Sequence, residues 1–145
     1  MKTMIGCRDR EDSLTEFHSA FGHPVNEKMT VDNLELRRSL ISEEYQELMQ
    51  EISSICLDLS RGKTPPIERR ANLLKELCDL QYVISGMAVA LGLPLQVAFN
   101  RVHASNMSKL DNEGNPVYRE DGKVMKGPNY RPPNLEDLVN EKLTV

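Results

Sequence analysis

The chain has 145 residues, of which 39% are hydrophobic, and this length and composition fit one folded domain with a buried core. Its formal net charge of −4 argues against a nucleic-acid partner bound by general neutralisation of backbone phosphates. Cys7, Cys56 and Cys78 are widely spaced and form no Cys-x-x-Cys pair, so they favour a reducing, cytoplasmic setting over a disulfide framework or a thiolate zinc site.

The first predicted helix covers residues 12–21. Asp12 or Ser13 is the expected cap, because a side-chain oxygen at this position satisfies a free backbone N–H group. Gly22 ends the helix. At this length the helix must dock on another element to be stable.

Two longer helices follow, and their apolar spacing predicts a hairpin. The first begins near Asp32 or Asn33 and ends at Gly62, and the second begins near Ile67. In both, apolar side chains alternate at intervals of four and three residues, so we expect the two stripes to face each other in an antiparallel pair. The stripes are Ile41, Tyr45, Leu48, Ile52, Ile55 and Leu59, and Leu73, Leu77, Leu80, Ile84, Met87 and Leu91.

The segment of residues 80–100 contains no charged residue, which raises the question of a membrane span. A spanning helix needs about 20 mainly apolar residues, whereas the apolar part here covers only residues 82–95 and contains Gly92 and Pro94. We therefore expect no membrane partner. Pro94 instead opens a fourth helix that continues to about Leu110.

The remainder of the chain is rich in Asn, Asp, Gly and Pro, which predicts irregular backbone. Residues 117–119 and 123–125 flank Asp121-Gly122 and can pair as a small hairpin. Asn134 is a candidate cap for a final short helix that reaches Leu143.

The predicted fold class is all-α: an antiparallel bundle of four main helices with an irregular C-terminal tail. We expect residues 1–145 to form a single domain, with a helical core at residues 12–110 and a tail at residues 111–145.

Acidic side chains without cations among them mark the second helix. Between Ser39 and Ser60 there is no Lys or Arg. Like charges four residues apart on a helix cost about 0.2–0.5 kcal/mol per pair, so a solvated helix normally interleaves cations. The acidic residues in this stretch are Glu43, Glu44, Glu47, Glu51 and Asp58.

A second acidic pair lies on the third helix, where Glu76 and Asp79 flank its apolar stripe as Glu44 and Glu47 flank the stripe of the second helix. Half-buried carboxylates on adjacent helices repel each other unless a cation lies between them. Oxygen ligands of this kind suit Mg²⁺ or Mn²⁺, which also bridge to phosphates. The alternative is a pair of acidic helix surfaces exposed to solvent.

Together, these motifs resemble a known signature. Residues 42–47, Ser-Glu-Glu-Tyr-Gln-Glu, and residues 76–82, Glu-Leu-Cys-Asp-Leu-Gln-Tyr, resemble the Glu-Glu-x-x-Glu and Glu-x-x-Asp motifs of the all-α nucleotide pyrophosphohydrolases. That superfamily includes the MazG proteins, phosphoribosyl-ATP pyrophosphohydrolase and the dimeric dUTPases. Residues 102–109 and the tail residues 121–133 are also similar to members of this group, so the resemblance covers about residues 15–134.

The resemblance implies a reaction and a set of catalytic residues. Glu44, Glu47, Glu76 and Asp79 would hold Mg²⁺, with Mn²⁺ as a substitute, on the triphosphate of a nucleotide. Glu43 would be a further ligand or the base that orients the attacking water. Hydrolysis between the α- and β-phosphates would then release a nucleoside monophosphate and pyrophosphate.

Binding residues for the substrate are expected after residue 100. The resemblance implies that Asn106 and Lys109 contact the phosphates. Lys126 and Arg131 are candidates for the same role, because residues 101–131 carry six Lys or Arg against four acids, although solvated surface cations have the same pattern. Tyr130 can stack on a base or anchor the tail.

Three other classes of protein were compared with the sequence: a di-iron bundle, a calcium-binding loop and a non-enzymatic helical module. A di-iron bundle needs Glu-x-x-His on two helices, and no His follows these glutamates at that spacing. A calcium loop near Asp111 lacks Glu at its twelfth position. A non-enzymatic helical module that uses the apolar stripes to oligomerise remains open.

The base and sugar of the substrate are not determined by these motifs, and dUTP or another non-standard deoxynucleotide is the leading expectation. The resemblance implies a homodimer or homotetramer. Apolar faces on two long helices would also be hard to cover in a monomer, which supports the same inference.

Overall fold

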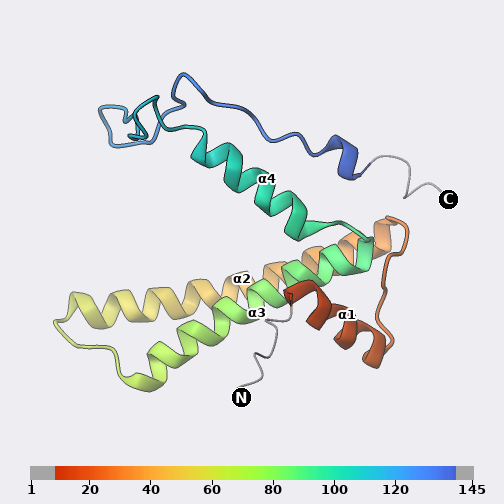
Figure 1. Cartoon of the computed structure of the whole chain (residues 1–145). Coiled ribbons are helices and arrows are strands. Elements are labelled where there is room, and N and C mark those ends of the chain that lie inside the picture. The colour runs from red at the N-terminus through yellow and green to blue at the C-terminus, as the bar shows by residue number, and fades with distance from the viewer. Residues whose placement is uncertain (1–8, 140–145) are drawn as a thin grey trace, which may run out of the picture. The chain divides into compact units, whose positions relative to one another are not determined.

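The computed structural model describes residues 9–139, and the regular structure in this range is helical (Figure 1). The helices are α1 (Arg10–Phe21), α2 (Val31–Ser60), α3 (Ile67–Leu91), α4 (Leu95–Met107) and a short 3-10 helix, η1 (Glu136–Leu138). The predicted all-α class with four main helices is confirmed. The chain forms two compact units, Met1–Gly92 and Leu93–Val145, which are described separately. The single domain expected over residues 1–145 stays a prediction.

The first two helices are capped earlier than the sequence indicated. Asp9 accepts a hydrogen bond from the Glu11 backbone N–H at 3.1 Å, so α1 begins at Arg10. The predicted cap at Asp12 or Ser13 is wrong, because Asp9 takes this role and both residues lie inside the helix. At the start of α2, the Thr30 hydroxyl accepts from the Asn33 N–H at 3.1 Å.

Glycines end α2 and α3 as predicted. Gly62 and Gly92 have φ angles of 69° and 66°, a left-handed conformation that favours glycine and commonly ends a helix. The segment between α1 and α2 adds hydrogen bonds to the end of α3. The backbone N–H groups of Asn26 and Glu27 donate to the carbonyls of Val89 and Ala90 at 2.9 and 2.8 Å. This contact anchors the start of α2 beside the end of α3.

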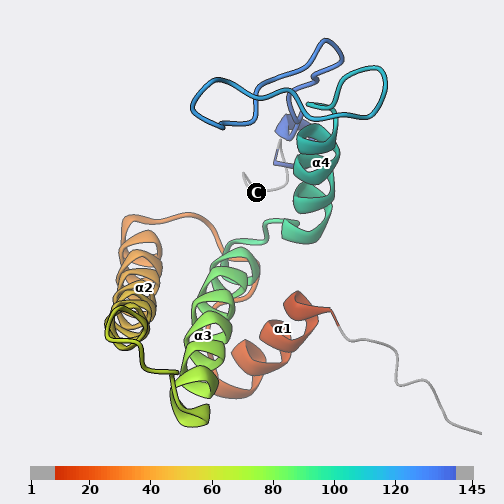
Figure 2. The ribbon, with the colours of Figure 1, turned by 90° about the vertical axis from the view of Figure 1, so that its left-hand side faces the viewer.

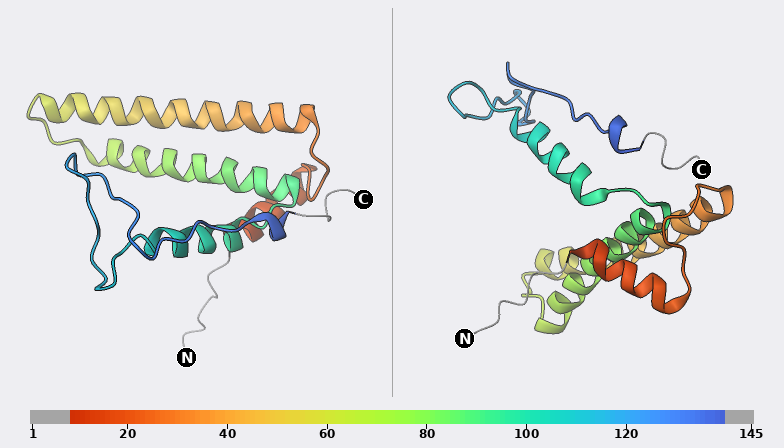
Figure 3. Two further views of the ribbon diagram at one scale, coloured as in Figure 1. Left: turned by 90° about the horizontal axis from the view of Figure 1, so that it is seen from above. Right: turned by 45° about the vertical axis from the view of Figure 1, so that its right-hand side comes forward.

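In the first unit, α3 is the central helix. It packs against α2 on one side and α1 on the other (Figure 2). Figure 3 shows α2 and α3 side by side as an antiparallel hairpin. Most of the fully buried apolar residues come from the last turns of α3, with one each from α1 and α2: Leu14, Leu48, Ala88, Val89, Ala90 and Leu91.

The expected closure of the two apolar stripes is only partly correct. Leu48 and Leu91 are buried, but Tyr45 is 52% exposed and Ile84 is 38% exposed. Each apolar stripe is wider than the contact that one partner helix can make. One side of the paired stripes therefore stays exposed. This side forms an apolar groove of about 760 Å³. Its apolar lining residues are Leu34, Ile41, Tyr45, Leu80, Ile84 and Met87.

The second unit consists of α4 and the tail, which returns along this helix. The Ser105 hydroxyl donates to the Arg131 carbonyl at 2.7 Å, and Arg101 binds both carboxylate oxygens of Asp137. The predicted small hairpin is present as one antiparallel bridge between Tyr118 and Val124.

The predicted last helix is shorter than expected. Asn134 accepts from the Glu136 N–H at 3.2 Å, as a cap would, but the following turn is the three-residue η1. Leu143 lies outside the described residues. The fourth helix likewise ends at Met107, before the expected Leu110.

The uncharged segment of residues 80–100 is divided between α3 and α4. Within residues 9–139, no single helix has both the length and the apolar character of a membrane span. Those two helices reach that threshold only when they are counted together across the break at residues 92–94.

Candidate active site

Carboxylates from α2 and α3 converge in the middle of the hairpin. One oxygen from each of Glu44, Glu47 and Glu76 lies within 4.8 Å of the other two. We call these three residues the carboxylate cluster. Glu44 and Glu47 are one turn apart on α2, and Glu76 faces them from α3, so the cluster exists only because the two helices pack together.

Two oxygens of the cluster are buried without a hydrogen-bond donor in the described part of the chain. They are Oε2 of Glu44 and Oε2 of Glu76. Burial raises the pKa of Glu44, and the negative charges of Asp79, Glu47 and Glu43 raise it further. A buried acceptor without a donor costs free energy. A divalent cation would satisfy both oxygens and offset the repulsion, so the residues present fit a magnesium or manganese site.

Two other acidic residues of α2, Glu51 and Asp58, have a cationic partner, contrary to the expectation from α2 alone. Arg69 of α3 lies 3.5 Å from Glu51 and 3.2 Å from Asp58. Because Arg69 comes from the facing helix, the sequence of α2 could not reveal it. These ion pairs distinguish Glu51 and Asp58 from Glu44 and Glu47 on the same helix.

Asp79 and Glu43 lie at the border of the cluster. Asp79 is half-buried, and its Oδ2 accepts a hydrogen bond from Lys75 Nζ at 2.6 Å. The same ammonium lies 3.3 Å from Glu76. Glu43 is exposed on α2 and close enough to influence Glu44 by its charge. Asp79 as a metal ligand, and Glu43 as a further ligand or the base, stay predictions.

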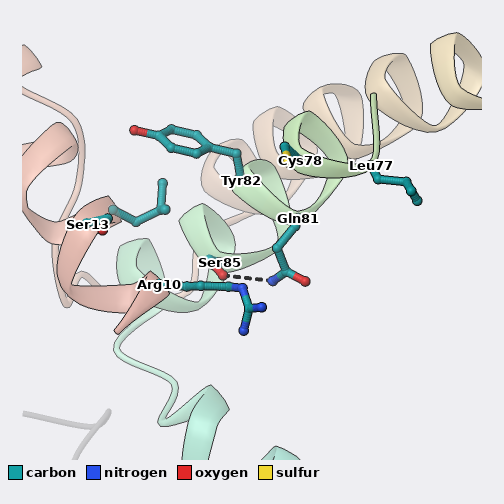
Figure 4. A pocket seen from close by; sticks show the side chains of 8 residues that line it. Arg10, Ser13, Leu77, Cys78, Gln81, Tyr82 and Ser85 are labelled. Atoms are coloured by element: carbon teal, nitrogen blue, oxygen red, sulfur yellow. Dashed lines mark hydrogen bonds between the residues drawn. The ribbon is translucent and has the colours of Figure 1, made fainter. Parts of the chain in front are cut away.

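A hollow of about 510 Å³ lies between α1 and α3. Figure 4 shows Tyr82, Cys78 and Gln81 of α3 around it, with the hydrogen bond from Gln81 to Ser85 at 3.0 Å. Ser85 in turn donates to Glu11 of α1 at 2.9 Å. This chain of hydrogen bonds attaches α1 to α3.

The residues expected to bind substrate lie in the second unit. Asn106 is exposed on α4, and Lys109 follows the helix and is half-buried. Lys126 Nζ lies 4.5 Å from the centre of the Tyr130 ring, so a cation already occupies one face of this ring. The Arg131 backbone N–H donates to the Ser108 hydroxyl at 2.9 Å. These contacts dock the segment of Tyr130 and Arg131 on the end of α4.

A close approach makes this docking possible. The Gly127 N–H donates to the Lys109 carbonyl at 2.9 Å. A Cβ atom at Gly127 would lie 2.5 Å from the same oxygen and 2.9 Å from the carbonyl oxygen of Leu110. Only glycine fits there without a shift of the backbone. The tail is therefore held where Lys126 and Tyr130 stay beside Lys109.

Two comparisons with known proteins found similar proteins. The sequence model of the family described as phosphoribosyl-ATP pyrophosphohydrolase matches residues 14–106. A crystal structure of a candidate NTP pyrophosphohydrolase from Exiguobacterium sp. 255-15 is 27% identical, with 87% of this chain and 89% of that chain covered and a TM-score of 0.42. The search among curated proteins found no match.

Proposed function

Because the chain belongs to the phosphoribosyl-ATP pyrophosphohydrolase family and is a pyrophosphohydrolase of the MazG-like superfamily, we propose that it hydrolyses a nucleoside triphosphate with Mg²⁺. The products are the nucleoside monophosphate and pyrophosphate. The observation that carries this proposal is the carboxylate cluster, with its two buried oxygens that lack donors. Membership of an enzyme family also favours this function over a non-enzymatic interaction module.

The metal would be held by Glu44, Glu47, Glu76 and Asp79. When bound, it neutralises charge on the polyphosphate and lowers the pKa of a water molecule. Lys75 donates a hydrogen bond to Oδ2 of Asp79, which leaves the other carboxylate oxygen for the metal. The same ammonium lies 3.3 Å from Glu76, so it is a cation beside the site that can meet the phosphates.

Glu43 is the group of this chain that fits the role of base. It is exposed on α2, one residue from Glu44 and outside the carboxylate cluster. A carboxylate at this place accepts a proton from the attacking water. Its hydrogen bond to the water also orients the water in line with the scissile bond.

Four residues of the second unit are proposed to bind the substrate. Asn106, Lys109, Lys126 and Arg131 bind the remaining phosphate oxygens. Lys126 covers one face of the Tyr130 ring, which fits the alternative role of this residue, anchoring the tail.

The proposed substrate and the proposed oligomeric state are also based on the resemblance to this family. A non-standard deoxynucleotide such as dUTP is the leading substrate. A homodimer or homotetramer would cover the apolar groove of α2 and α3. Single exposed apolar residues need no such explanation, but a continuous apolar groove does. The free cysteines Cys56 and Cys78 agree with the predicted cytoplasmic setting, while Cys7 lies outside the described residues.

A panel of nucleoside triphosphates tests the proposal. The purified protein is incubated with each nucleotide in Mg²⁺ and in EDTA, and pyrophosphate release is measured. At least one nucleotide should be hydrolysed in Mg²⁺ and none in EDTA. Equal turnover under both conditions, or turnover that Glu44→Gln leaves unchanged, would remove the cluster from the reaction.

A further inference from the structure

Arg37 of α2 is a buried cation for which the described part of the chain provides no hydrogen-bond or ion-pair partner. The residue is 4% exposed, and within residues 9–139 no hydrogen bond or ion pair reaches its guanidinium. Burial lowers the pKa of Arg37 from its ordinary value, because desolvation disfavours the charged form. A guanidinium has five N–H donors and no acceptor. A ligand that meets it must therefore supply acceptors.

Arg37 lines a cavity of about 270 Å³ enclosed by α1, α2 and α3. Aromatic rings form much of its wall: Phe17 stacks on His23 with ring centres 5.7 Å apart and meets Tyr82 edge-on at 5.4 Å. The volume is below the about 300–1,000 Å³ of pockets for drug-sized ligands. Flat walls and a small volume suit a heteroaromatic ring.

His18 supplies an acceptor next to this donor. Its Nδ1 lies 2.6 Å from the Pro24 carbonyl, which can only accept, so Nδ1 carries the proton. His18 is 2% exposed, and burial lowers its pKa, which keeps the ring neutral and leaves Nε2 as a bare acceptor. A Cβ atom at Gly86 would lie 3.3 Å from this Nε2 and 3.6 Å from Arg37 Nη1. Because Gly86 has no side chain, the His18 imidazole and the Arg37 guanidinium both reach the same part of the cavity.

We infer that the Arg37–His18 cavity binds the base of the substrate by its lactam edge, a ring N–H beside a C=O. His18 Nε2 accepts from the ring N–H, and Arg37 donates to the carbonyl oxygen. Uracil, thymine, guanine and hypoxanthine have this edge, whereas cytosine and adenine present an unprotonated ring nitrogen beside an amino group. The inference rests on the proposed function and names the substrate class for it.

The position of the cavity along the hairpin agrees with this assignment. Arg37 precedes Glu44 by seven residues on α2, and Gly86 follows Asp79 by seven residues on α3. Seven residues are two turns, or about 10 Å along each helix, on nearly the same face. If the base of a nucleotide lies between Arg37 and His18, the sugar spans this distance. The phosphates then reach the carboxylate cluster.

Two pairs of substrates test the inference, because the members of each pair differ only in this edge of the base. They are dUTP with dCTP, and dITP with dATP. We expect kcat/KM to be at least about 10-fold higher for the lactam member of both pairs, since a well-made pair of hydrogen bonds to a base edge gives discrimination of this order. Calorimetry with deoxyuridine and deoxycytidine in EDTA should give the same order of affinity without metal or turnover.

Variants of the cavity separate its role from that of the metal site. Arg37→Met keeps most of the volume and should reduce both ratios to within about 3-fold of one, through loss of the charged hydrogen bond. Gly86→Ala leaves the charge in place and should weaken deoxyuridine binding by crowding Nε2. Arg70→Met is the control, because Arg70 is an exposed arginine of α3 that does not line the cavity. Circular dichroism confirms folding of each variant.

Several results would overturn the inference. One is a wild-type protein that treats both pairs alike or prefers cytosine or adenine, even if it hydrolyses all four nucleotides, in which case the proposed function stands. Another is pyrophosphate that binds in EDTA and is lost in Arg37→Met, since Arg37 would then hold a phosphate. Deoxyuridine binding that depends on Arg37 in a protein without hydrolysis would support the cavity and contradict the proposed function.

Discussion

Glu44 combines burial with negative neighbours, a combination that a solvated surface carboxylate does not have. One of its oxygens is buried without a donor in the described part of the chain, and four cluster or border residues act on it with the same charge. Such a group is costly in the empty protein and suited to a cation.

Removing one ligand charge should abolish most of the activity. Glu44→Gln and Asp79→Asn keep the shape of each side chain and should each lower kcat by at least about 100-fold, comparable to the loss of one preorganised electrostatic contact. Glu51→Gln is the matched control, because the partner of Glu51 is Arg69. Steady-state kinetics with saturating Mg²⁺ measures the effect. Near-normal turnover in both variants would place the site elsewhere.

The raised pKa of Glu44 predicts how metal-free stability depends on pH. Its folded pKa lies above the ordinary value of 4.5, so between these two values the folded state binds more protons than the unfolded state. The free energy of unfolding in EDTA therefore falls as pH rises through this window. Glu44→Gln should melt higher than the wild type in EDTA at pH 7, and the difference should vanish as pH falls towards 4.5.

Thermal melts in EDTA across this pH range provide the measurement. Glu51→Gln should instead be less stable than the wild type at pH 7, because it breaks an ion pair with Arg69. A Glu44→Gln variant that is weaker than the wild type at every pH would mean that Glu44 is stabilised, not strained, in the empty protein.

Most of the helix boundaries could be predicted from the sequence, because their signals are local. Gly62 and Gly92 end helices where they were expected to, and the spacing of apolar residues identified α2 and α3. The cap of α1 was missed because Asp9 precedes Asp12 and Ser13, and all three have suitable side chains. A choice among adjacent candidates depends on where the helix first meets its packing partner.

Contacts between helices were harder to predict. An apolar stripe indicates which side chains share a face, but it does not say which partner covers each part of that face, and Tyr45 and Ile84 remained exposed. Arg37, buried two turns before Glu44, was not recognised as part of the same face, although its spacing was visible in the sequence. Arg69 was missed because it pairs across the hairpin.

Arg69 should contribute to the stability of the α2–α3 hairpin. Its guanidinium joins Glu51 and Asp58 of α2 to the first turn of α3, and Glu51 is mostly buried. Arg69→Met should reduce the free energy of unfolding by about 1 kcal/mol, the upper range for a partly exposed ion pair. For a chain of this size the melting temperature should fall by roughly 3–5 °C.

The neighbouring Arg70 is the control for this variant. It is exposed, so Arg70→Met should leave the melting temperature nearly unchanged. Differential scanning calorimetry of both variants gives the comparison. Equal melting of Arg69→Met and wild type would show that the ion pairs with Glu51 and Asp58 add no stability.

At the scale of the whole molecule, the apolar groove predicts self-association. Ile84 lies in this groove, and a charge there would be unfavourable against an apolar partner surface. Ile84→Glu should convert the dimer or tetramer to a monomer of 16.5 kDa in size-exclusion chromatography with light scattering. Leu57→Glu, at an exposed apolar position of α2 outside the groove, should keep the wild-type mass. A monomeric wild type would contradict the proposed assembly.

Hydrolysis between the α- and β-phosphates at the carboxylate cluster is tested most directly by phosphorus NMR of the reaction with dUTP and Mg²⁺. The spectrum distinguishes the two ways in which a triphosphate can be cut. We predict signals of dUMP and pyrophosphate that grow in equal amounts and are absent when Glu44→Gln replaces the wild type. Orthophosphate together with dUDP, or the same spectrum from the Glu44→Gln variant, would contradict hydrolysis at this site.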